Sequence, residues 1–498
     1  MDLCRFRSLS VVAILLITSI GGCAMGGGSP PPPFQTVPSV REQASDTRLY
    51  YVDGTLQTSP CPAYNTSTQS CGDGRDLAFD NLADANGIDR AGDTIEIRAG
   101  HYLQPIRPAN SGTSKSPLIY RSYMNEAVTV KVAEEPALQL IRVQHVTVES
   151  IHFDKSLGWG RLEDSHHNRI VGNTFTEALA RGTTGGLKLV RSHYNRVEGN
   201  SFYQGNDSIA IQDSGHNLIS GNHLEFARHS LISVRCGNYN VIRANYLHNA
   251  RQKAGEIYDC EGVSDAPIKY DVTKRNLLEF NHFAHVTSSS EPDNFNGIQY
   301  VAQTGIVRHN WFIDNQGGAI HLAIYAEEAL YVYGNRIYGN RFINNRCHAL
   351  SAGDLPPLRA GDNRIHGNVF AANRDCRGTS ERVASHPLYT RVENIETAQD
   401  VGTLPEVWLA TTPAAGTGST LQLDDVLPFF DGHNITGEVG DEIELRSSRQ
   451  RARVTAIDFT TKSLTLNRPI TWAAGDGVRV IGSDSAARPG PLRTFTSQ

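Results

Sequence analysis

A phrase of about ten residues returns along this chain: HHNRIVGNTF begins at His166, and HYNRVEGNSF begins at His193. Related forms include GHNLISGNHL from Gly215 and DNRIHGNVF from Asp362. Each form has an Asn, a short run that alternates apolar and polar residues, a Gly-Asn pair or a variant of it, and then an aromatic residue or Leu one position on. The second Asn falls at positions 173, 200, 222, 245, 281, 310, 340 and 368, so the repeat is 22 to 36 residues long. This period is typical of a solenoid, in which each unit buries its apolar face against its neighbours.

The runs inside the repeats predict short β-strands. They contain Ile, Val, Leu and Phe separated by Asn and Gly, which tolerate the left-handed backbone of a tight corner. An α-helix needs roughly ten residues at helical spacing, and no repeat has room for one. Stacked Asn side chains at one corner, at Asn173, Asn200, Asn222 and Asn245, would bond to the next coil. The pattern resembles the right-handed parallel β-helix of the pectate-lyase-like superfamily over roughly residues 90–380.

We therefore expect an all-β protein: a right-handed parallel β-helix solenoid with a small C-terminal antiparallel β domain. We divide the chain into a lipoprotein signal peptide (1–23), a flexible tether (24–48), the β-helix with an N-terminal cap (49–380), the small β domain (401–482) and a tail (483–498). Residues 76–90 predict an amphipathic helix in the cap. Residues 452–481 alternate apolar and polar side chains, and residues 460–462 predict a hairpin turn.

The first residues indicate export. Arg5 and Arg7 precede an apolar run from Leu9 to Ile20, which is too short to span a bilayer. The run ends just before Cys23 and resembles the lipobox of bacterial lipoproteins, which implies lipid attachment at Cys23; a plain signal peptide is the alternative. By the same resemblance Ala24, which is not Asp, implies an outer-membrane lipoprotein that faces the periplasm or the cell surface.

The cysteine spacing fits an oxidising compartment. Six cysteines remain after Cys4 and Cys23, and they form three pairs close in sequence: Cys61 with Cys71, Cys236 with Cys260, and Cys347 with Cys376. The last two separations are about one coil, so disulfides there would join adjacent coils. Six buried thiols are the alternative.

The charge excludes one class of partner. The 498 residues contain 46 Lys and Arg against 52 Asp and Glu, a net charge of -6 without a basic footprint. Nucleic acid is therefore not an expected partner.

The strands that follow each Gly-Asn phrase predict a groove for an extended polymer. If the apolar side chains point inward, one outward row contains Lys188, Ala210, Ser233, Tyr258, Gln299, His321 and Ser351. The two longest interruptions of the repeat, residues 249–273 and 284–296, should rise beside this row and form its walls.

This row contains the groups that β-elimination of a uronic acid polymer needs. A cation must neutralise the substrate carboxylate, a base must remove the proton beside it, and an acid must assist the leaving oxygen. Tyr258 and His321 are candidates for base and acid, and Arg235 and Lys188 for the cations. The remaining candidates are Arg191, His229, Lys253 and Gln299 for substrate contacts, and Asp213, Glu256 and Asp259 as ligands of calcium, the expected cofactor.

The entrance coils, AGDTIEIRAGHYLQPI from Ala91 and SGTSKSPLIYRS from Ser111, resemble those of the alginate lyase and chondroitinase B family. The stretch around SLISVRC resembles that family's catalytic strand. This sequence has Arg235 where the family has Lys, and Glu256 near the position of an Arg. Arg228 and Ser230 replace the calcium-binding acids. The family's catalytic set is thus not intact here.

The sequence predicts a polysaccharide as ligand and leaves three functions open. The first is elimination of a uronic acid polymer. The second is a glycoside hydrolase or epimerase, with acids supplied by Asp207 and Asp213, or by Glu256, Asp259 and Glu261. The third is a surface lipoprotein that binds glycan without catalysis.

Overall fold

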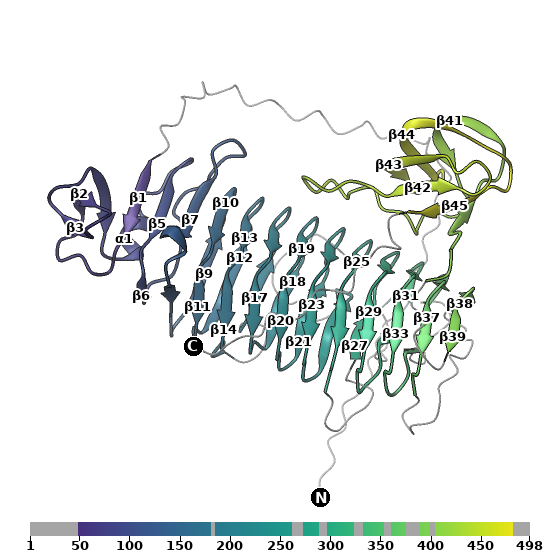
Figure 1. The fold of residues 1–498 in the computed structure, drawn as a ribbon, viewed down its shortest axis with the longest axis horizontal. Coiled ribbons are helices and arrows are strands. Elements are labelled where there is room, and N and C mark those ends of the chain that lie inside the picture. The colour runs from purple at the N-terminus through teal and green to yellow at the C-terminus, as the bar shows by residue number, and fades with distance from the viewer. Residues whose placement is uncertain are drawn as a thin grey trace, which may run out of the picture. The chain divides into compact units, whose positions relative to one another are not determined.

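Each repeat forms one coil of short parallel strands, and the strands of successive coils lie side by side in three sheets (Figure 1). A computed structural model describes residues 48–180, 185–260, 272–287, 296–322, 332–352, 360–374, 389–397 and 404–481. The predictions for residues 1–23, most of the tether, the tail, Cys376 and Glu261 fall outside these residues. None of the helices in the described parts is long and apolar enough to cross a membrane.

Among the described residues, the first sheet, sheet A, has 16 strands. They are β1 (Leu49–Val52), β2 (Cys61–Asn65), β3 (Ser70–Cys71), β4 (Asp76–Phe79), β5 (Thr94–Ile97), β7 (Leu118–Ser122), β10 (Val146–Glu149), β13 (Arg169–Val171), β16 (Arg196–Glu198), β19 (Leu218–Ser220), β22 (Val241–Arg243), β25 (Leu277–Glu279), β28 (Ile306–Arg308), β32 (Arg336–Tyr338), β36 (Asn363–His366) and β38 (Tyr389–Val392).

In the same residues, sheet B has 12 strands and sheet C has nine. Sheet B contains β6 (Gly100–Tyr102), β8 (Val128–Val130), β11 (His152–Asp154), β14 (Thr174–Thr176), β17 (Ser201–Tyr203), β20 (His223–Glu225), β23 (Tyr246–His248), β26 (His282–Ala284), β29 (Trp311–Ile313), β33 (Arg341–Ile343), β37 (Val369–Ala371) and β39 (Ile395–Thr397). Sheet C contains β9 (Pro136–Ile141), β12 (Gly158–Glu163), β15 (Leu187–Val190), β18 (Asp207–Gln212), β21 (Ser230–Arg235), β24 (Lys253–Tyr258), β27 (Asn296–Tyr300), β30 (Ile320–Leu322) and β34 (Leu350–Ala352). Two short strands, β31 (Val332–Tyr333) and β35 (Ala360–Gly361), pair with each other in a separate sheet.

The two positions that recur in every phrase, the Asn and the aromatic residue or Leu, have separate structural roles. The aromatic position points into the coil, where Phe175 stacks on Phe202 with ring centroids 4.7 Å apart and both rings are fully buried. The Asn position forms the predicted ladder at a corner. Asn200 Nδ2 donates to the Ile170 carbonyl at 2.8 Å, and Asn200 Oδ1 accepts from the backbone amide of Asn173 at 2.8 Å. Each Asn thus satisfies buried backbone groups of the preceding coil.

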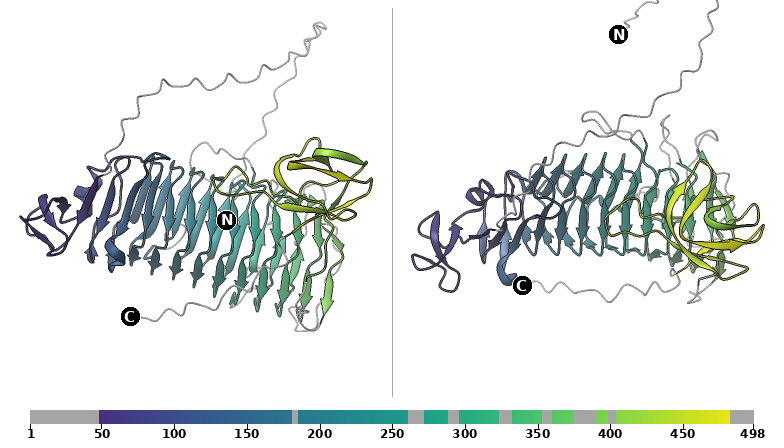
Figure 2. Two further views of the ribbon diagram at one scale, coloured as in Figure 1. Left: turned by 45° about the horizontal axis from the view of Figure 1, so that its top comes forward. Right: turned by 90° about the horizontal axis from the view of Figure 1, so that it is seen from above.

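The C-terminal region forms the predicted antiparallel β domain within the same compact unit as the solenoid. Its strands are β40 (Ala410–Thr411), β41 (Gly416–Gln422), β42 (Glu442–Leu445), β43 (Arg451–Asp458), β44 (Ser463–Trp472) and β45 (Gly477–Val480). The hairpin predicted at residues 460–462 joins β43 to β44. The expectation of a right-handed parallel β-helix followed by a small antiparallel domain is confirmed; two views of the coils are given in Figure 2.

Two details of the predicted organisation differ. Residues 76–90 do not form one helix, because Asp76–Phe79 pairs with β1 as strand β4. The helix is the short α1 (Leu82–Asn86), whose N-cap Asn81 accepts from the backbone amide of Asp84 at 2.9 Å; a single 3-10 turn follows at Tyr123–Asn125. The solenoid also continues past residue 380, since β38 and β39 pair with the preceding coil. Asn394, which lies between these two strands, extends the ladder without a preceding Gly.

Two of the predicted disulfides are present, Cys61–Cys71 and Cys236–Cys260. The second joins the ends of adjacent strands of sheet C, with Cα atoms 4.6 Å apart. The third predicted pair includes Cys376, which lies outside the described residues.

Candidate functional site

Sheet C presents the polar row that the sequence predicts, with one change. Strand pairing places Lys188, Ala210 and Ser233 in successive coils, and then Glu256, Gln299, His321 and Ser351. Tyr258 was expected in the place that Glu256 holds. Strand β24 begins at Lys253, and its register pairs Ser233 with Glu256, so Tyr258 lies in the next row beside Arg235.

Glu256 contacts several polar side chains, and we call it and its charged and polar neighbours the Glu256 cluster (Glu256, Lys253, Arg235, Ser233, His229 and Asp207). Lys253 Nζ lies 2.8 Å from Glu256 Oε1, and Arg235 Nη2 lies 3.7 Å from Glu256 Oε2. Ser233 Oγ donates to Glu256 Oε2 at 3.3 Å. The Glu256 carboxylate is therefore contacted by cationic side chains from two strands, Arg235 of β21 and Lys253 of β24.

Burial and charge act in opposite directions on Glu256. Only 3% of the residue is exposed, and this burial by itself raises the pKa of the carboxyl group. The charges of Lys253, His229 and Arg235 outweigh burial and leave the pKa of Glu256 below its ordinary value. Glu256 is therefore ionised at neutral pH.

Asp207 and His229 form a dyad at the corner that leads into the same strands. His229 Nδ1 lies 2.7 Å from Asp207 Oδ1, and Asp207 also accepts from the backbone amide of Ser230 at 3.1 Å. Asp207 is 1% exposed, whereas 31% of the His229 side chain is exposed. When Nδ1 donates to Asp207, the other ring nitrogen, Nε2, has the lone pair that can accept a proton.

Tyr258 and Gln299 extend the cluster. The Arg235 guanidinium carbon lies 5.4 Å from the centroid of the Tyr258 ring, a cation–π distance. Gln299 follows Glu256 in the row and is 1% exposed. Its Oε1 atom has no hydrogen-bond partner among the described residues, so an acceptor is available beside Glu256.

The structure does not bring all predicted catalytic residues together. Lys188 lies three coils before Glu256, about 14 Å away at the usual strand spacing, and His321 lies two coils after it, about 10 Å away. His321 Nδ1 is within 2.6 Å of Ser351 Oγ. Arg191, a predicted substrate contact, is held by Glu163 and Asp164 at 2.7 and 2.8 Å. These three residues therefore lie apart from the Glu256 cluster.

The predicted calcium ligands do not fit a calcium ion. Glu256 is already neutralised by two cations, and Asp259 Oδ1 accepts from the backbone amides of Cys260 and Thr273 at 2.9 and 3.1 Å. Asp213 follows strand β18, two coils before the end of β24, whereas calcium needs its oxygen ligands within about 2.6 Å. Within the described ranges, no group of three or more His, Cys, Asp or Glu side chains could hold a metal ion.

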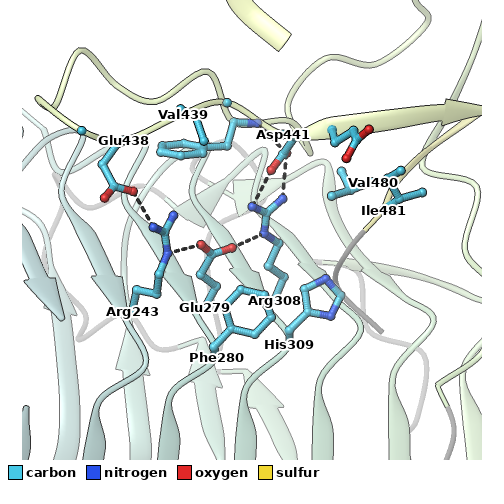
Figure 3. A pocket seen from close by; sticks show the side chains of 14 residues that line it. Arg243, Glu279, Phe280, Arg308, His309, Glu438, Val439, Asp441, Val480 and Ile481 are labelled. Carbon is cyan, nitrogen blue, oxygen red and sulfur yellow. Dashed lines mark hydrogen bonds and ion pairs between the residues drawn. The ribbon is translucent and has the colours of Figure 1, made fainter. Parts of the chain in front are cut away.

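A pocket lies between sheet A and the C-terminal domain, and several of the charged side chains that line it form ion pairs (Figure 3). It has a volume of about 320 Å³. Glu279 binds Arg243 at 2.5 Å and Arg308 at 2.7 Å, and Arg308 also binds Asp441. Figure 3 shows these side chains pointing toward one another. We therefore assign this pocket to the attachment of the domain.

Comparison with known proteins finds similarity in fold. Residues 119–298, less than half of the chain, match the family described as "Periplasmic copper-binding protein (NosD)". No curated protein sequence matches the chain. Similar solved structures include a GH136 lacto-N-biosidase from Eubacterium ramulus, with 15% identity, coverage of 70% of this chain and 68% of that chain, and a TM-score of 0.44.

Two further similar structures are lyases. One is a mannuronic acid specific polysaccharide family 6 lyase from human gut microbiota, with 13% identity, coverage of 61% of this chain and 86% of that chain, and a TM-score of 0.40. The other is pectate lyase Pel9A, with 11% identity, coverage of 68% and 79%, and a TM-score of 0.40. At these identities and scores, none of them assigns a reaction or a substrate to this chain.

The sequence predicted Asp207 and His229 separately and missed their pairing. Asp207 begins strand β18, and His229 immediately precedes strand β21. They are 22 residues apart, which is one coil. Asp207 pairs with Ser230, the residue after His229, so the repeat places the two residues in neighbouring coils but does not by itself predict their contact.

Proposed function

We propose that this protein cleaves a uronic acid polymer by β-elimination, with the polymer bound along the polar row of sheet C. The observation that carries the proposal is that one strand, β21, has the His229–Asp207 dyad at its start and Arg235 at its end, with Arg235 paired to the ionised Glu256. Elimination needs these groups because the proton beside a carboxylate is weakly acidic until the carboxylate charge is neutralised.

The roles follow from exposure and hydrogen bonding. Arg235, with 37% of its side chain exposed, binds the substrate carboxylate. His229 Nε2 removes the proton from the carbon that bears the carboxylate, while Asp207 holds the ring and stabilises its charged form. To Tyr258, which is 8% exposed and packs beside Arg235, we assign the proton that the leaving oxygen receives. One C–H bond and one C–O bond of the substrate break, and a C=C bond forms. His229 gains the proton from carbon, and Tyr258 loses a proton to the leaving oxygen.

Glu256 and Lys253 act on the reaction through Arg235. Glu256 is buried, and its carboxylate contacts both Lys253 and Arg235. We infer that it fixes the Arg235 guanidinium on sheet C, beside Tyr258. Glu256 is a positioning residue and not an acid catalyst, since its lowered pKa keeps it ionised.

The same property makes hydrolysis less favourable. A glycosidase needs a carboxylic acid with a raised pKa to protonate the leaving group, beside a second carboxylate. Glu256 has a lowered pKa. Asp259, its proposed partner, is occupied by backbone amides.

The test is incubation of the purified protein with alginate, pectate, chondroitin and hyaluronan, followed by two readouts. Ultraviolet absorbance reports the new C=C bond conjugated with a carboxylate, and a reducing-end assay reports any cleavage. Absorbance and reducing ends that rise together support elimination. Reducing ends without absorbance would indicate hydrolysis, and binding to the polymer with neither signal would indicate a glycan-binding protein.

We also propose that Cys23 carries a lipid that anchors the protein in the outer membrane, on the basis of the lipobox-like sequence before it. Metabolic labelling with a radioactive fatty acid tests this. Label on the natural chain that is absent from a Cys23→Ala variant is expected. Equal labelling of both would contradict the anchor.

A further inference from the structure

The C-terminal domain has a cluster of arginines around one tryptophan. The guanidinium carbons of Arg446, Arg449 and Arg479 lie 5.5, 5.5 and 5.3 Å from the centroid of a Trp408 ring. The indole packs on strand β45 at Gly477, where a Cβ atom would lie 3.0 Å from the ring. A residue without a side chain is thus what allows Trp408 to lie flat on the sheet and support the arginines.

Strand pairing adds two more arginines to the same face. Arg479, Glu444 and Arg451 form one row across β45, β42 and β43. Glu442 and Arg453 form the next row on that face, two residues along. We call this set the Trp408 surface (Trp408, Arg446, Arg449, Arg451, Arg453 and Arg479).

The positive charges on this surface exceed the negative ones. Glu444 accepts from Arg449, Arg451 and Arg479 at 2.8, 2.9 and 2.8 Å, and its side chain is 3% exposed. Three carboxylates, those of Glu406, Glu442 and Glu444, face the five guanidinium groups.

Two of the five arginines remain available for a ligand. Arg446 and Arg453 are exposed and form no ion pair with a described residue. The paired arginines also face solvent, since 56% of the Arg449 side chain and 53% of the Arg451 side chain are exposed.

Guanidinium groups bind carboxylates and sulfates through paired hydrogen bonds, and rigid support from an aromatic ring lowers the entropy lost on binding. We propose that the Trp408 surface is a second, non-catalytic binding site for an anionic polysaccharide, with Arg446 and Arg453 as the primary contacts. The choice of a uronic acid polymer as ligand rests on the proposed function. The existence of an anion-binding surface does not.

A polysaccharide fits this surface better than nucleic acid or a membrane. Proteins bind the phosphate backbone of nucleic acid with continuous patches of Lys and Arg. On the Trp408 surface three carboxylates lie among the arginines, so the patch is not continuous. Insertion into a membrane needs exposed apolar side chains. Among the described residues of β42, β43 and β45, none is a large exposed apolar residue.

The test is retardation of the full-length protein in electrophoresis gels that contain pectate, chondroitin sulfate or neutral dextran. An Arg446→Ala/Arg453→Ala variant is compared with Lys131→Ala/Arg142→Ala, a control that removes two exposed positive charges from the solenoid. We expect the first variant to bind the anionic polymers about tenfold more weakly than the control. Neither protein should be retarded by dextran.

Equal retardation of the two variants would overturn the proposal, as would equal binding to dextran. Stronger and Arg446-dependent binding to phosphatidylglycerol vesicles or to duplex DNA would overturn it in favour of those partners. The elimination assay separates this result from the proposed function. Arg446-dependent binding without elimination would support the binding surface and contradict the proposed reaction. Elimination without Arg446-dependent binding would support the reaction and contradict the binding surface.

Discussion

Arg308 in sheet A donates two hydrogen bonds to Asp441 in the C-terminal domain, at 2.8 and 2.7 Å (Figure 3). Both side chains are about 5% exposed or less. Arg308 also binds Glu279, which is bound in turn by Arg243. A buried guanidinium between two carboxylates makes the attachment of the domain depend on each member of the set.

We expect Asp441→Asn to destabilise the protein by about 3 kcal/mol, because it removes a buried charge and leaves Arg308 partly unpaired. The exposed neighbour Glu442 provides the control, as Glu442→Gln changes the same charge on the same strand region. The measurement is the midpoint of urea unfolding followed by tryptophan fluorescence. Equal midpoints for the two variants would show that the ion pair does not stabilise the attachment.

Stability should fall in mild acid because of His248. Burial, and then the neighbouring His282, His285 and His223, lower the pKa of His248 from 6.5 to about 2. In the unfolded chain His248 therefore binds a proton as the pH falls through about 6.5, whereas in the folded chain it stays neutral at that pH. The stability from neutral His248 is present above pH 6.5 and falls below it, by up to about 1.4 kcal/mol per pH unit.

A His248→Phe variant should flatten this dependence, whereas His101→Phe at an exposed position should not. The measurement is the thermal midpoint of each protein from about pH 7 to about pH 5. The same acid sensitivity in His248→Phe as in the natural chain would place the effect on other groups.

The Asn ladder should be costly to interrupt. Asn222 Oδ1 accepts from the backbone amide of Asn200 at 2.9 Å, and Asn222 Nδ2 donates to the Val197 carbonyl at 2.8 Å. Asn222→Ala leaves these buried backbone groups unpaired, at a cost of about 3 kcal/mol in the free energy of unfolding. Asn344→Ala, at an exposed corner, should cost less, about 1 kcal/mol, because the backbone there is left-handed (φ 51°) and the Asn344 side chain bonds only the exposed Asp314. A similar loss in both variants would contradict a structural role for the ladder.

The Cys236–Cys260 disulfide should support the proposed site. Cys236 follows Arg235, and Cys260 lies two residues after Tyr258, so the bond fixes the ends of the two strands that carry these residues. Its separation of 24 residues predicts a loss of about 3 kcal/mol on removal. A Cys236→Ala/Cys260→Ala variant should lose both thermal stability and activity on polymer, whereas Cys61→Ala/Cys71→Ala should keep its activity. Full activity in the first variant would separate the disulfide from the site.

The sequence predicted the solenoid because its rules are local and repeated. Phe175 and Phe202 follow their Asn residues by the same interval, and each coil must place that aromatic side chain in the same part of the core. The register of sheet C was harder to predict. A shift of one residue reverses the face of a strand and disrupts the apolar pattern, but a shift of two preserves both. Tyr258 was misplaced by such a shift, because nothing in the sequence marks Lys253 as the start of β24.

The sequence repeat did not predict which side chains of different coils contact each other. Asp207 and His229 lie at corners, whose lengths vary from coil to coil, so their distance depends on the structure of the corner. The arginines around Trp408 meet through the antiparallel pairing of β42 with β45. Alternation of apolar and polar residues predicts those strands but not their order in the sheet.

The most direct test of the central claim is the rate of absorbance increase on the uronic acid polymer that the natural protein cleaves, measured for His229→Ala. If His229 is the base, the rate should fall by about 100-fold or more. His101→Ala, with an exposed histidine on sheet B, should keep the natural rate. An undiminished rate in folded His229→Ala would contradict the assignment of the Glu256 cluster as the catalytic site.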